Sequence, residues 1–372
     1  MKIVVDDKIP YIQGVFEPYA EVVYAPGAMI DTAMVKDADA LIIRTRTKCN
    51  RELLDGSNVK IIATATIGFD HIDRSYCDDH GIVWQNAPGC NSWSVAQYMA
   101  AMFALLYLEK GIDVKGLTLG VVGVGNVGRK VSKYASLLGM KVLLNDPPLE
   151  REGVDMDFVS LDKIKSESDI ITFHVPLSMD GDDATFHMVD TKFLLECEKK
   201  PILCNTCRGE VFDTEVLKQV FDREQLSWLV VDCWEHEPDI DRVLLKEVWV
   251  TTPHIAGYSR DGKAMGTAMS VATISSYFNL PIKDWWPETI EVPQQVDIDL
   301  RGLDSRKALW LAISHTYRMV DEIELLKNSP ETFEQQRGSY PLRREFPAYR
   351  VISEDLSVVK ILKEMNFQVA EL

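Results

Sequence analysis

The sequence lacks the features that mark membrane and secreted proteins. Its most apolar stretch, SVAQYMAAMFALLYLEKG, is shorter than a bilayer span and is interrupted by Gln97, so it predicts a buried helix. The first residues, MKIVVDDKIP, have no long apolar core of the kind found in signal peptides. We therefore expect a cytoplasmic protein with no membrane partner.

Excess positive charge is also missing. The chain has 40 Lys and Arg against 57 Asp and Glu, a formal net charge of -17. Binding to nucleic acid or to an anionic membrane depends on clustered basic residues, so neither partner is expected. If the substrate is an anion, its site must be locally basic within this acidic chain.

The cysteines show no disulfide or metal pattern. There are 7 of them in 372 residues, an odd number scattered along the chain, which is typical of reduced cytosolic thiols. Cys204 and Cys207 form a C-x-x-C, but no second pair follows at metal-ligand spacing. We therefore expect no metal and interpret this pair as packing at a strand end.

What the sequence does contain is alternation of strand-like and helical segments, in a chain too long for one ordinary domain. This pattern predicts parallel sheets with helices on both faces. The strand-like segments of the first series are 2–6, 21–25, 40–45, 60–66 and 81–86, with helical patterns at 11–19, 31–38, 49–55 and 71–80. A helix from about 92 to 111 leads to strand-like segments 117–123, 141–146, 169–175, 201–206, 226–232 and 248–255. Beyond them we expect helices at 262–279 and 305–326, and the chain then ends in the segment 349–353, a short helix and the segment 367–372.

A glycine-rich loop follows the first strand of the second series. Gly123, Gly125 and Gly128 form G-x-G-x-x-G between a strand and a helix. The first glycine permits a tight turn, the second allows backbone amides to approach a pyrophosphate, and the third allows close helix packing. The residues expected to contact a dinucleotide here are Gly123, Gly125, Asn126, Val127 and Gly128.

The next strand ends in Asp146, where an acidic residue would hydrogen-bond an adenosine ribose. Its charge would repel a 2′-phosphate, and Pro147 and Pro148 follow it instead of an arginine. The sequence therefore predicts NAD rather than NADP.

Three groups suited to hydride-transfer chemistry follow three later strands. Arg208 could bind a carboxylate through two parallel hydrogen bonds. Glu237 could pair with the imidazole of His254, fix its tautomer and stabilise its charge. The imidazole would accept a hydroxyl proton as hydride leaves the same carbon, which is typically worth ~10²–10⁴-fold in rate. His236, in a run of charged residues, is the weaker candidate.

The segments NTCRGEVFD, CWEHEP and TPHIAGYS resemble those of the D-isomer-specific 2-hydroxyacid dehydrogenase family. The resemblance implies that Arg208 orients the substrate, Glu237 pairs with the histidine, and His254 is the acid–base. It implies an α/β fold with two doubly wound parallel-sheet lobes, a Rossmann-type cofactor lobe and a flavodoxin-like substrate lobe, plus a small C-terminal α+β dimerisation domain. The expected domains are 1–93 with 258–288 for substrate, 94–257 for NAD, and 289–372 for dimerisation.

Within the family, the resemblance is closer to the branch that oxidises 4-phospho-D-erythronate in pyridoxal 5′-phosphate (vitamin B6) biosynthesis. It includes APGCN, HIAGYSRDGKA and the C-terminal RGSYPLRREFPAYRVIS, and it implies a homodimer. The residues implied in substrate binding are Thr45, Thr66, Arg208 and Tyr258, and those implied in cofactor binding are Asp146, Thr206, Cys207, Arg208, Asp232 and Gly257. Val175 stands where related enzymes often carry threonine, so no side-chain hydrogen bond is expected there.

A basic cluster in the first series agrees with a phosphorylated substrate. Arg44, Arg46 and Lys48 surround Thr45 at a predicted strand end. Side chains alternate along a strand, so we do not expect all four to reach one ligand. Arg44 and Arg46 are the candidates for the phosphate.

Two other functions fit the same motifs. One is another D-2-hydroxyacid dehydrogenase, such as one acting on 3-phosphoglycerate, and the other is a non-catalytic NAD(H)-sensing interaction protein. The pair Arg343 and Arg344 could reach across a dimer toward the substrate phosphate. The sequence favours instead two solvated surface charges.

Overall fold

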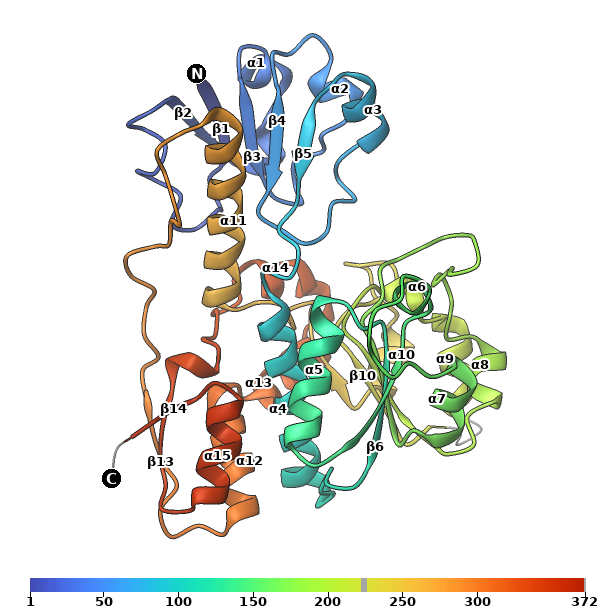
Figure 1. The fold of residues 1–372 in the computed structure, drawn as a ribbon. Coiled ribbons are helices and arrows are strands. Elements are labelled where there is room, and N and C mark those ends of the chain that lie inside the picture. The colour runs from blue at the N-terminus through green and yellow to red at the C-terminus, as the bar shows by residue number, and fades with distance from the viewer. Residues whose placement is uncertain (222–225, 371–372) are drawn as a thin grey trace. The chain divides into compact units, whose positions relative to one another are not determined.

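The computed structural model describes residues 1–221 and 226–370, which pack into two compact units (Figure 1). Unit 1 comprises Met1–Asn91 and Ser259–Glu291, and unit 2 comprises Ser92–Tyr258 and Val292–Leu372. The C-terminal residues thus pack with the residues of the expected cofactor lobe. A separately folding C-terminal domain stays a prediction.

Unit 1 is built on a parallel sheet with the strand order β2-β1-β3-β4-β5. This is the flavodoxin-like order, in which the chain reverses direction across the sheet beside its first strand. The predicted flavodoxin-like lobe is therefore confirmed. Its strands are β1 (Lys2–Asp6), β2 (Glu21–Ala25), β3 (Ala40–Ile43), β4 (Ile61–Thr64) and β5 (Val83–Gln85).

Alternate side chains of this sheet build two hydrophobic cores, one on each face. Val4 and Leu41 belong to the core covered by α1, α2 and α3, whereas Ile3 and Ile42 belong to the core covered by α11. Burial on both faces explains why these strands are continuous apolar runs. The helices of unit 1 are η1 (Gly27–Met29), α1 (Thr32–Val35), α2 (Arg51–Leu54), α3 (Arg74–Asp79) and α11 (Arg260–Phe278).

The helix predicted at 11–19 is wrong. These residues form turns, with Tyr11 and Gly14 at φ of 63° and 86°, values that do not continue a right-handed helix. Ile12 and Phe16 are nevertheless buried in the core beside α11. Their apolar spacing reflects this burial rather than a helix.

Unit 2 contains a parallel sheet with the order β11-β10-β9-β8-β6-β7. An isolated bridge between Leu144 and Phe158 stands beside β7, where a Rossmann sheet has its third strand. The order therefore agrees with the predicted Rossmann-type lobe. The strands are β6 (Thr118–Val122), β7 (Lys141–Asn145), β8 (Ile170–Phe173), β9 (Ile202–Asn205), β10 (Trp228–Val231) and β11 (Val250–Thr251).

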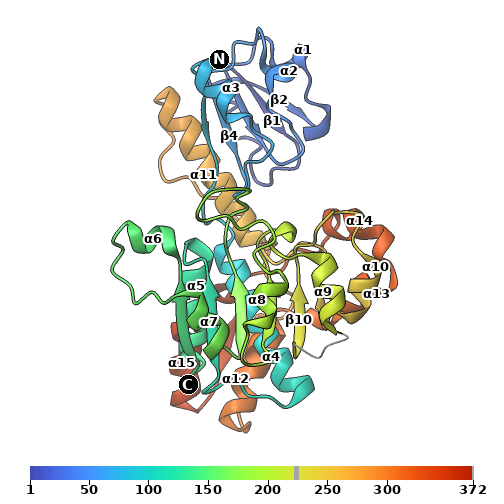
Figure 2. The same ribbon diagram turned by 90° about the vertical axis from the view of Figure 1, so that its right-hand side faces the viewer.

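Helices cover both faces of this sheet, with α4 and α5 on one side and α7, α8 and α9 on the other (Figures 1 and 2). The predicted buried helix is confirmed as α4, which packs against α5, α12 and α13. No helix within the described residues is long and apolar enough to cross a membrane. The helices before the C-terminal segment are α4 (Ser92–Lys110), α5 (Asn126–Leu137), α6 (Pro147–Arg151), α7 (Leu161–Glu167), α8 (Thr191–Leu195), η2 (Gly209–Val211), α9 (Thr214–Phe221) and α10 (Arg242–Glu247).

The C-terminal segment adds a third parallel sheet, β12-β13-β14, and further helices to unit 2. The single helix predicted at 305–326 is wrong, because the chain breaks at Tyr317, which is extended at φ -155° and ψ 108°. Tyr317 is buried against Tyr98, so tertiary packing overrides the continuous helical pattern. The elements are β12 (Asp297–Asp299), α12 (Ser305–Thr316), α13 (Met319–Asn328), η3 (Pro330–Thr332), α14 (Phe333–Gly338), η4 (Phe346–Ala348), β13 (Arg350–Ile352), α15 (Leu356–Glu364) and β14 (Gln368–Val369).

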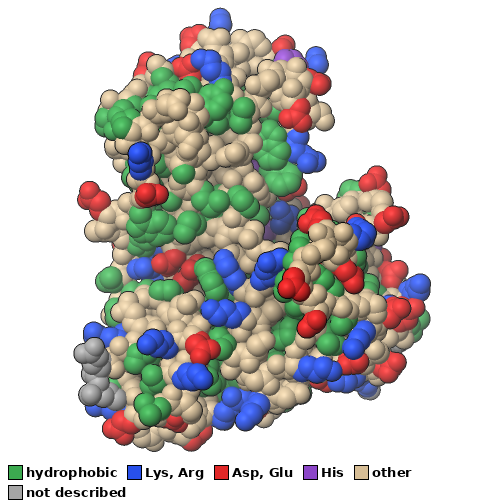
Figure 3. Space-filling model, in the orientation of Figure 1, with side chains coloured by type: hydrophobic (Ala, Val, Ile, Leu, Met, Phe, Trp, Pro, Cys, Tyr) green, Lys and Arg blue, Asp and Glu red, His purple; other side chains and the backbone are tan. Residues whose placement is uncertain are grey.

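On the face drawn in Figure 3, Lys and Arg side chains are interspersed with Asp and Glu. The expectation that nucleic acid is not a partner stays a prediction.

Arg343 is not the solvated surface charge that the sequence favoured. Its side chain is 7% exposed and its guanidinium lies 4.4 Å from the centre of the Tyr317 ring. Each of its three nitrogens donates hydrogen bonds. The acceptors are Gln97 Oε1 (3.1 Å), the Ile255 carbonyl (3.2 Å), the Tyr340 hydroxyl (3.1 Å), the Ser94 carbonyl (3.1 Å) and the Ala256 carbonyl (2.5 Å).

We predict that Arg343→Met destabilises the protein by about 3 kcal/mol or more, because it leaves several buried carbonyl groups without a donor. Thermal or urea unfolding measures the change. Arg318→Met is the matched control, since its side chain is 74% exposed and its pair with Asp321 spans 3.3 Å. Equal effects of the two substitutions would contradict the structural role of Arg343.

Candidate active site

The candidate site lies where three neighbouring strands of unit 2 end. β9, β10 and β11 are adjacent and parallel, so their carboxyl ends share one edge of the sheet. Arg208 follows β9, Glu237 follows β10, and His254 follows β11. This edge is where ligands bind in open α/β sheets.

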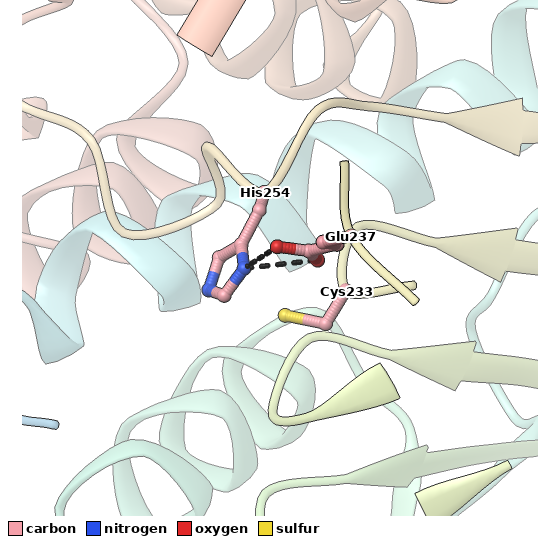
Figure 4. A group of neighbouring side chains, drawn as sticks. All are labelled: Cys233, Glu237 and His254. Atoms are coloured by element: carbon pink, nitrogen blue, oxygen red, sulfur yellow. Dashed lines mark hydrogen bonds and ion pairs between the residues drawn. The ribbon is translucent and has the colours of Figure 1, made fainter. Parts of the chain in front are cut away.

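Glu237 and His254 form a direct pair (Figure 4). His254 Nδ1 lies 2.9 Å from Glu237 Oε2 and 3.0 Å from Oε1. An ionised carboxylate only accepts hydrogen bonds, so Nδ1 is the protonated nitrogen of the neutral ring and Nε2 is left with a lone pair. Nε2 points away from the carboxylate, and the side chain is 26% exposed. It can therefore accept a proton from a ligand.

Glu237 is arranged to remain ionised. Burial alone would raise its pKa, but the interaction with His254 lowers it, aided by the Trp234 N–H and by Arg337. The pKa of Glu237 lies below its ordinary value as a result. The Trp234 amide donates to Oε1 at 2.9 Å, which fixes the carboxylate in place.

A buried carboxylate shapes the loop that carries His254. Asp232 is 1% exposed, and its backbone carbonyl accepts the His254 amide at 2.8 Å. Asp232 Oδ1 accepts from the Ile255 amide at 2.7 Å, and Oδ2 accepts from the Ala256 amide at 2.9 Å. These bonds hold His254 at φ 55°, a left-handed conformation that a non-glycine residue adopts at some cost. The predicted cofactor contacts of Asp232 and Gly257 stay predictions.

Arg208 lies on the same edge, in a segment pinned by Asn205. Asn205 Nδ2 donates to the Arg208 carbonyl at 2.8 Å, and Oδ1 accepts from the Cys207 amide at 3.1 Å. The positive charge of Arg208 acts on the Cys233 thiol and by itself lowers the pKa of that thiol. The thiol lies beside Glu237 and His254.

Cys233, Glu237 and His254 offer ligand atoms within 4.8 Å of one another (Figure 4). Burial raises the pKa of the Cys233 thiol well above its ordinary value, which opposes the thiolate that a metal would need. Glu237 already accepts the hydrogen bond from His254 Nδ1. The cluster is better suited to acid–base chemistry than to metal binding.

The glycine loop has the geometry expected of a dinucleotide site. Gly123 is at φ 89°, and a side chain there would meet the backbone of His174 at 2.7 Å. A side chain at Gly128 would meet the Gly123 carbonyl oxygen at 2.0 Å, whereas one at Gly125 would have no neighbour within 4 Å. The outer glycines therefore serve packing, and Gly125 faces open space that a pyrophosphate could fill.

The helix beyond this loop is open at its start. α5 has no side-chain cap, so the first amides, at Asn126 and Val127, are presented toward an anion. Asp146 stabilises the loop from the end of β7, since Oδ2 accepts from the Val124 amide at 2.8 Å. Its Oδ1 accepts from the Leu149 amide at 3.1 Å. A carboxylate has lone pairs left for a ribose after these two bonds.

His174, which the sequence did not single out, links the ends of β8 and β9. His174 Nε2 lies 3.1 Å from Thr172 Oγ1 and Nδ1 lies 3.2 Å from Thr206 Oγ1. Burial lowers the pKa of His174 to about 3, so the ring is neutral. Val175 adjoins Gly123 and is partly buried, in agreement with the expectation that it gives no side-chain hydrogen bond.

Unit 1 carries the other predicted substrate residues. Thr45 and Arg46 are exposed after β3, whereas Arg44 Nη1 donates to the Lys8 carbonyl at 3.3 Å. Thr66 Oγ1 contacts Thr64 Oγ1 at 2.8 Å. Their contacts with substrate stay predictions.

Two C-terminal residues lie beside Tyr258, the predicted substrate residue of unit 2. The Tyr340 ring centre is 6.3 Å from that of Tyr258, and the Arg337 guanidinium carbon is 5.8 Å from it. Arg337 Nη1 also lies 3.9 Å from Glu237 Oε2. The sequence offered no signal for Arg337, because it lies a hundred residues from Glu237 in the chain.

Comparison with known proteins decides the family. Erythronate-4-phosphate dehydrogenase of Bacteroides thetaiotaomicron is 49% identical over 95% of this chain and 99% of its own length. The enzymes of that name from Porphyromonas gingivalis and Escherichia coli are 41% and 37% identical over 99% of this chain. The chain belongs to the erythronate-4-phosphate dehydrogenase family. Residues 101–256 match the family model described as D-isomer specific 2-hydroxyacid dehydrogenase, NAD binding domain, so the predicted family and cofactor are confirmed.

Solved structures agree on the dehydrogenase fold. D-lactate dehydrogenase from Aquifex aeolicus, with NAD and lactic acid, is 26% identical with a TM-score of 0.63, and covers 74% of this chain and 95% of its own. The 3-phosphoglycerate dehydrogenase of Entamoeba histolytica, with NAD+, is 25% identical with a TM-score of 0.64, and covers 78% of this chain and 99% of its own. Each of these two alignments thus leaves about a quarter of this chain unmatched, whereas the erythronate-4-phosphate dehydrogenases match it almost throughout.

We predict that Gly125→Ala weakens NAD binding about tenfold or more, because the new methyl group enters the space open to the pyrophosphate. Its effect on stability should be small, about 0.5 kcal/mol. Gly128→Ala should instead destabilise the fold by about 2–4 kcal/mol through its clash with the Gly123 carbonyl. Calorimetric titration with NAD and thermal unfolding separate the two effects. A fully retained NAD affinity in Gly125→Ala would contradict this loop assignment.

We predict that His174 makes stability depend on pH. In the unfolded chain a histidine takes up a proton below about pH 6.5, whereas His174 in the folded chain does so only near pH 3. Its contribution is therefore present above pH 6.5 and is lost as the pH falls, by about 2 kcal/mol at pH 5. Urea unfolding at pH 7 and pH 5 should show a smaller pH dependence in His174→Gln than in the unchanged protein. Equal dependence would show that His174 is not buried as a neutral ring.

Proposed function

We propose that the protein oxidises 4-phospho-D-erythronate at C2 to 2-oxo-3-hydroxy-4-phosphobutanoate with NAD, as a step of pyridoxal 5′-phosphate biosynthesis. The observation that carries this proposal is the Glu237–His254 pair at 2.9 Å in a chain 37–49% identical to erythronate-4-phosphate dehydrogenases. The pair supplies the proton transfer that oxidation of a hydroxyl requires.

His254 acts as the base. Its Nε2 accepts the C2 hydroxyl proton, and the resulting imidazolium is stabilised by Glu237 through the bond at Nδ1. The ring is already oriented by that bond and by the left-handed backbone at φ 55°. Little reorganisation is therefore needed before proton transfer.

Arg208 binds the substrate carboxylate and the developing carbonyl oxygen. A guanidinium matches a carboxylate through two parallel hydrogen bonds. Asn205 fixes the segment of Arg208, and Asp232 fixes the loop of His254. These two residues lie at the carboxyl ends of the adjacent strands β9 and β10. This arrangement fixes the substrate relative to the base.

The residues of the glycine loop fit NAD. The uncapped start of α5 and the open space at Gly125 suit the pyrophosphate, and Asp146 suits the ribose hydroxyls. NAD held by these residues would supply the hydride acceptor for the oxidation at C2. Thr206, Cys207, Asp232 and Gly257 line the strand-end edge where the nicotinamide end would be held.

The remaining assignments concern the phosphate and the assembly. Thr45 and Thr66 of unit 1 contact the substrate, and Arg44 and Arg46 are the candidates for binding its phosphate. The protein works in the cytoplasm as a homodimer that forms through its C-terminal residues.

We expect NADH formation at 340 nm with 4-phospho-D-erythronate, and much slower formation with 3-phosphoglycerate or unphosphorylated D-2-hydroxyacids. His254→Ala should lower turnover at least ~10²-fold and leave NAD affinity unchanged, because the ring transfers a proton and does not bind the pyrophosphate. Loss of NAD binding in this variant would contradict the acid–base assignment. Preference for 3-phosphoglycerate would replace the proposed substrate. A lack of turnover together with tight NADH binding would favour a sensor.

A further inference from the structure

Arg337 brings a positive charge from the C-terminal segment to the acid–base pair. Its side chain is 24% exposed, and Nη1 lies 3.9 Å from Glu237 Oε2. The guanidinium carbon is 5.8 Å from the centre of the Tyr258 ring, and the Tyr258 side chain hydrogen-bonds to it. Arg337 therefore contacts both the partner of the catalytic histidine and a predicted substrate residue.

The position of Arg337 is fixed by packing. It belongs to α14, whose first residue, Phe333, is 1% exposed. Phe333 and Leu326 of α13 lie in the core that also contains Trp234 and Ile240, on either side of Glu237 in sequence. The helix carrying Arg337 is thus anchored to the segment carrying Glu237.

Burying a guanidinium costs free energy, so its environment must compensate for that cost. At 3.9 Å the contact with Glu237 is longer than a hydrogen bond, and the Glu237 oxygens already accept from His254 and from the Trp234 amide. Arg337 therefore acts on Glu237 through its charge. It favours the ionised carboxylate without competing for the bond to His254.

We propose that Arg337 is a positioning residue of the active site, which keeps Glu237 ionised and held against His254 and orients Tyr258. The proposal rests on the function proposed above. It makes the C-terminal segment part of the catalytic unit within one chain, in addition to any role in dimerisation.

The charge of Arg337 also bears on the protonation of His254. Glu237 and Asp232 are acidic and favour the imidazolium, whereas Arg337 is cationic and opposes it. Oxidation requires the neutral ring, so Arg337 keeps the base ready to accept a proton. The titratable and charged groups around the ring are Asp232, Cys233 and Glu237 after β10, Tyr258 after β11, Arg208 after β9, and Arg337 and Arg343 from the C-terminal segment.

The kinetic test compares Arg337→Met and Arg337→Lys with Arg242→Met, a surface control whose pair with Glu331 spans 3.7 Å. Arg337→Met should lower kcat about 10–100-fold with less than about a threefold change in KM. The acidic limb of its kcat–pH profile should move to higher pH. Arg337→Lys, which keeps the charge, should restore most of the pH profile, and Arg242→Met should behave as the unchanged enzyme.

The same assays identify a different role. Each variant is measured with 4-phospho-D-erythronate and with D-erythronate, which lacks the phosphate. A rise in KM confined to the phosphorylated substrate would make Arg337 a phosphate ligand and overturn the positioning role. An unchanged kcat and pH profile in Arg337→Met would overturn it as well.

A titration without substrate separates this proposal from the proposed function. In the NAD complex, the imidazole resonances of His254 are followed by NMR against pH and assigned with His254→Ala. The transition should move upward by about 0.5–1 pH unit in Arg337→Met and stay in place in Arg242→Met. A shift in a protein inactive on every substrate would support Arg337 and reject the proposed substrate. No shift would reject the role of Arg337 whatever the substrate.

Discussion

The candidate site depends on Asp232 and Arg343, two buried side chains of opposite charge that bind the backbone of the same two residues. Asp232 accepts hydrogen bonds from the amides of Ile255 and Ala256, and Arg343 donates to their carbonyls. The amides and the carbonyls of these two residues therefore have hydrogen-bond partners, although the loop is neither a helix nor a strand. This arrangement fixes the left-handed backbone that directs His254 toward Glu237. If Asp232 were removed, Arg343 would stay buried and the amides of Ile255 and Ala256 would lose their acceptor. If Arg343 were removed, Asp232 would stay buried and the carbonyls of the same two residues would lose their donor.

Arg343 shows why the C-terminal segment and the strand ends form one unit. The residues it joins come from the start of α4, the loop after β11 and the segment before η4. α12 and α13 of the C-terminal segment pack against α4. The C-terminal segment thus supports the loop that carries His254 directly through Arg343, and Arg337 of the same segment lies 3.9 Å from Glu237.

The sequence predicted what depends on local pattern. Alternating apolar runs located the two doubly wound sheets, and polar residues after strands located Glu237 and His254, since neighbouring parallel strands share an edge. Features that depend on distant packing were missed or wrong. The segment around Phe16 has helical spacing but adopts turns, and the helical pattern through Tyr317 is broken by its burial. Arg343 was expected to be solvated because a doublet of arginines gives no sign of the carbonyls it meets.

The charge of -17 becomes intelligible once the arginines are located. A surface acid costs little because water screens it, whereas a buried cation acts at close range in a medium of low polarity. Arg343 and Arg337 are both largely withdrawn from water and lie beside Asp232 and Glu237. Net charge therefore describes the surface and its solubility, whereas the potential at His254 depends on the charged groups close to it. An acidic protein can act on an acidic substrate because these two charge populations are spatially separate.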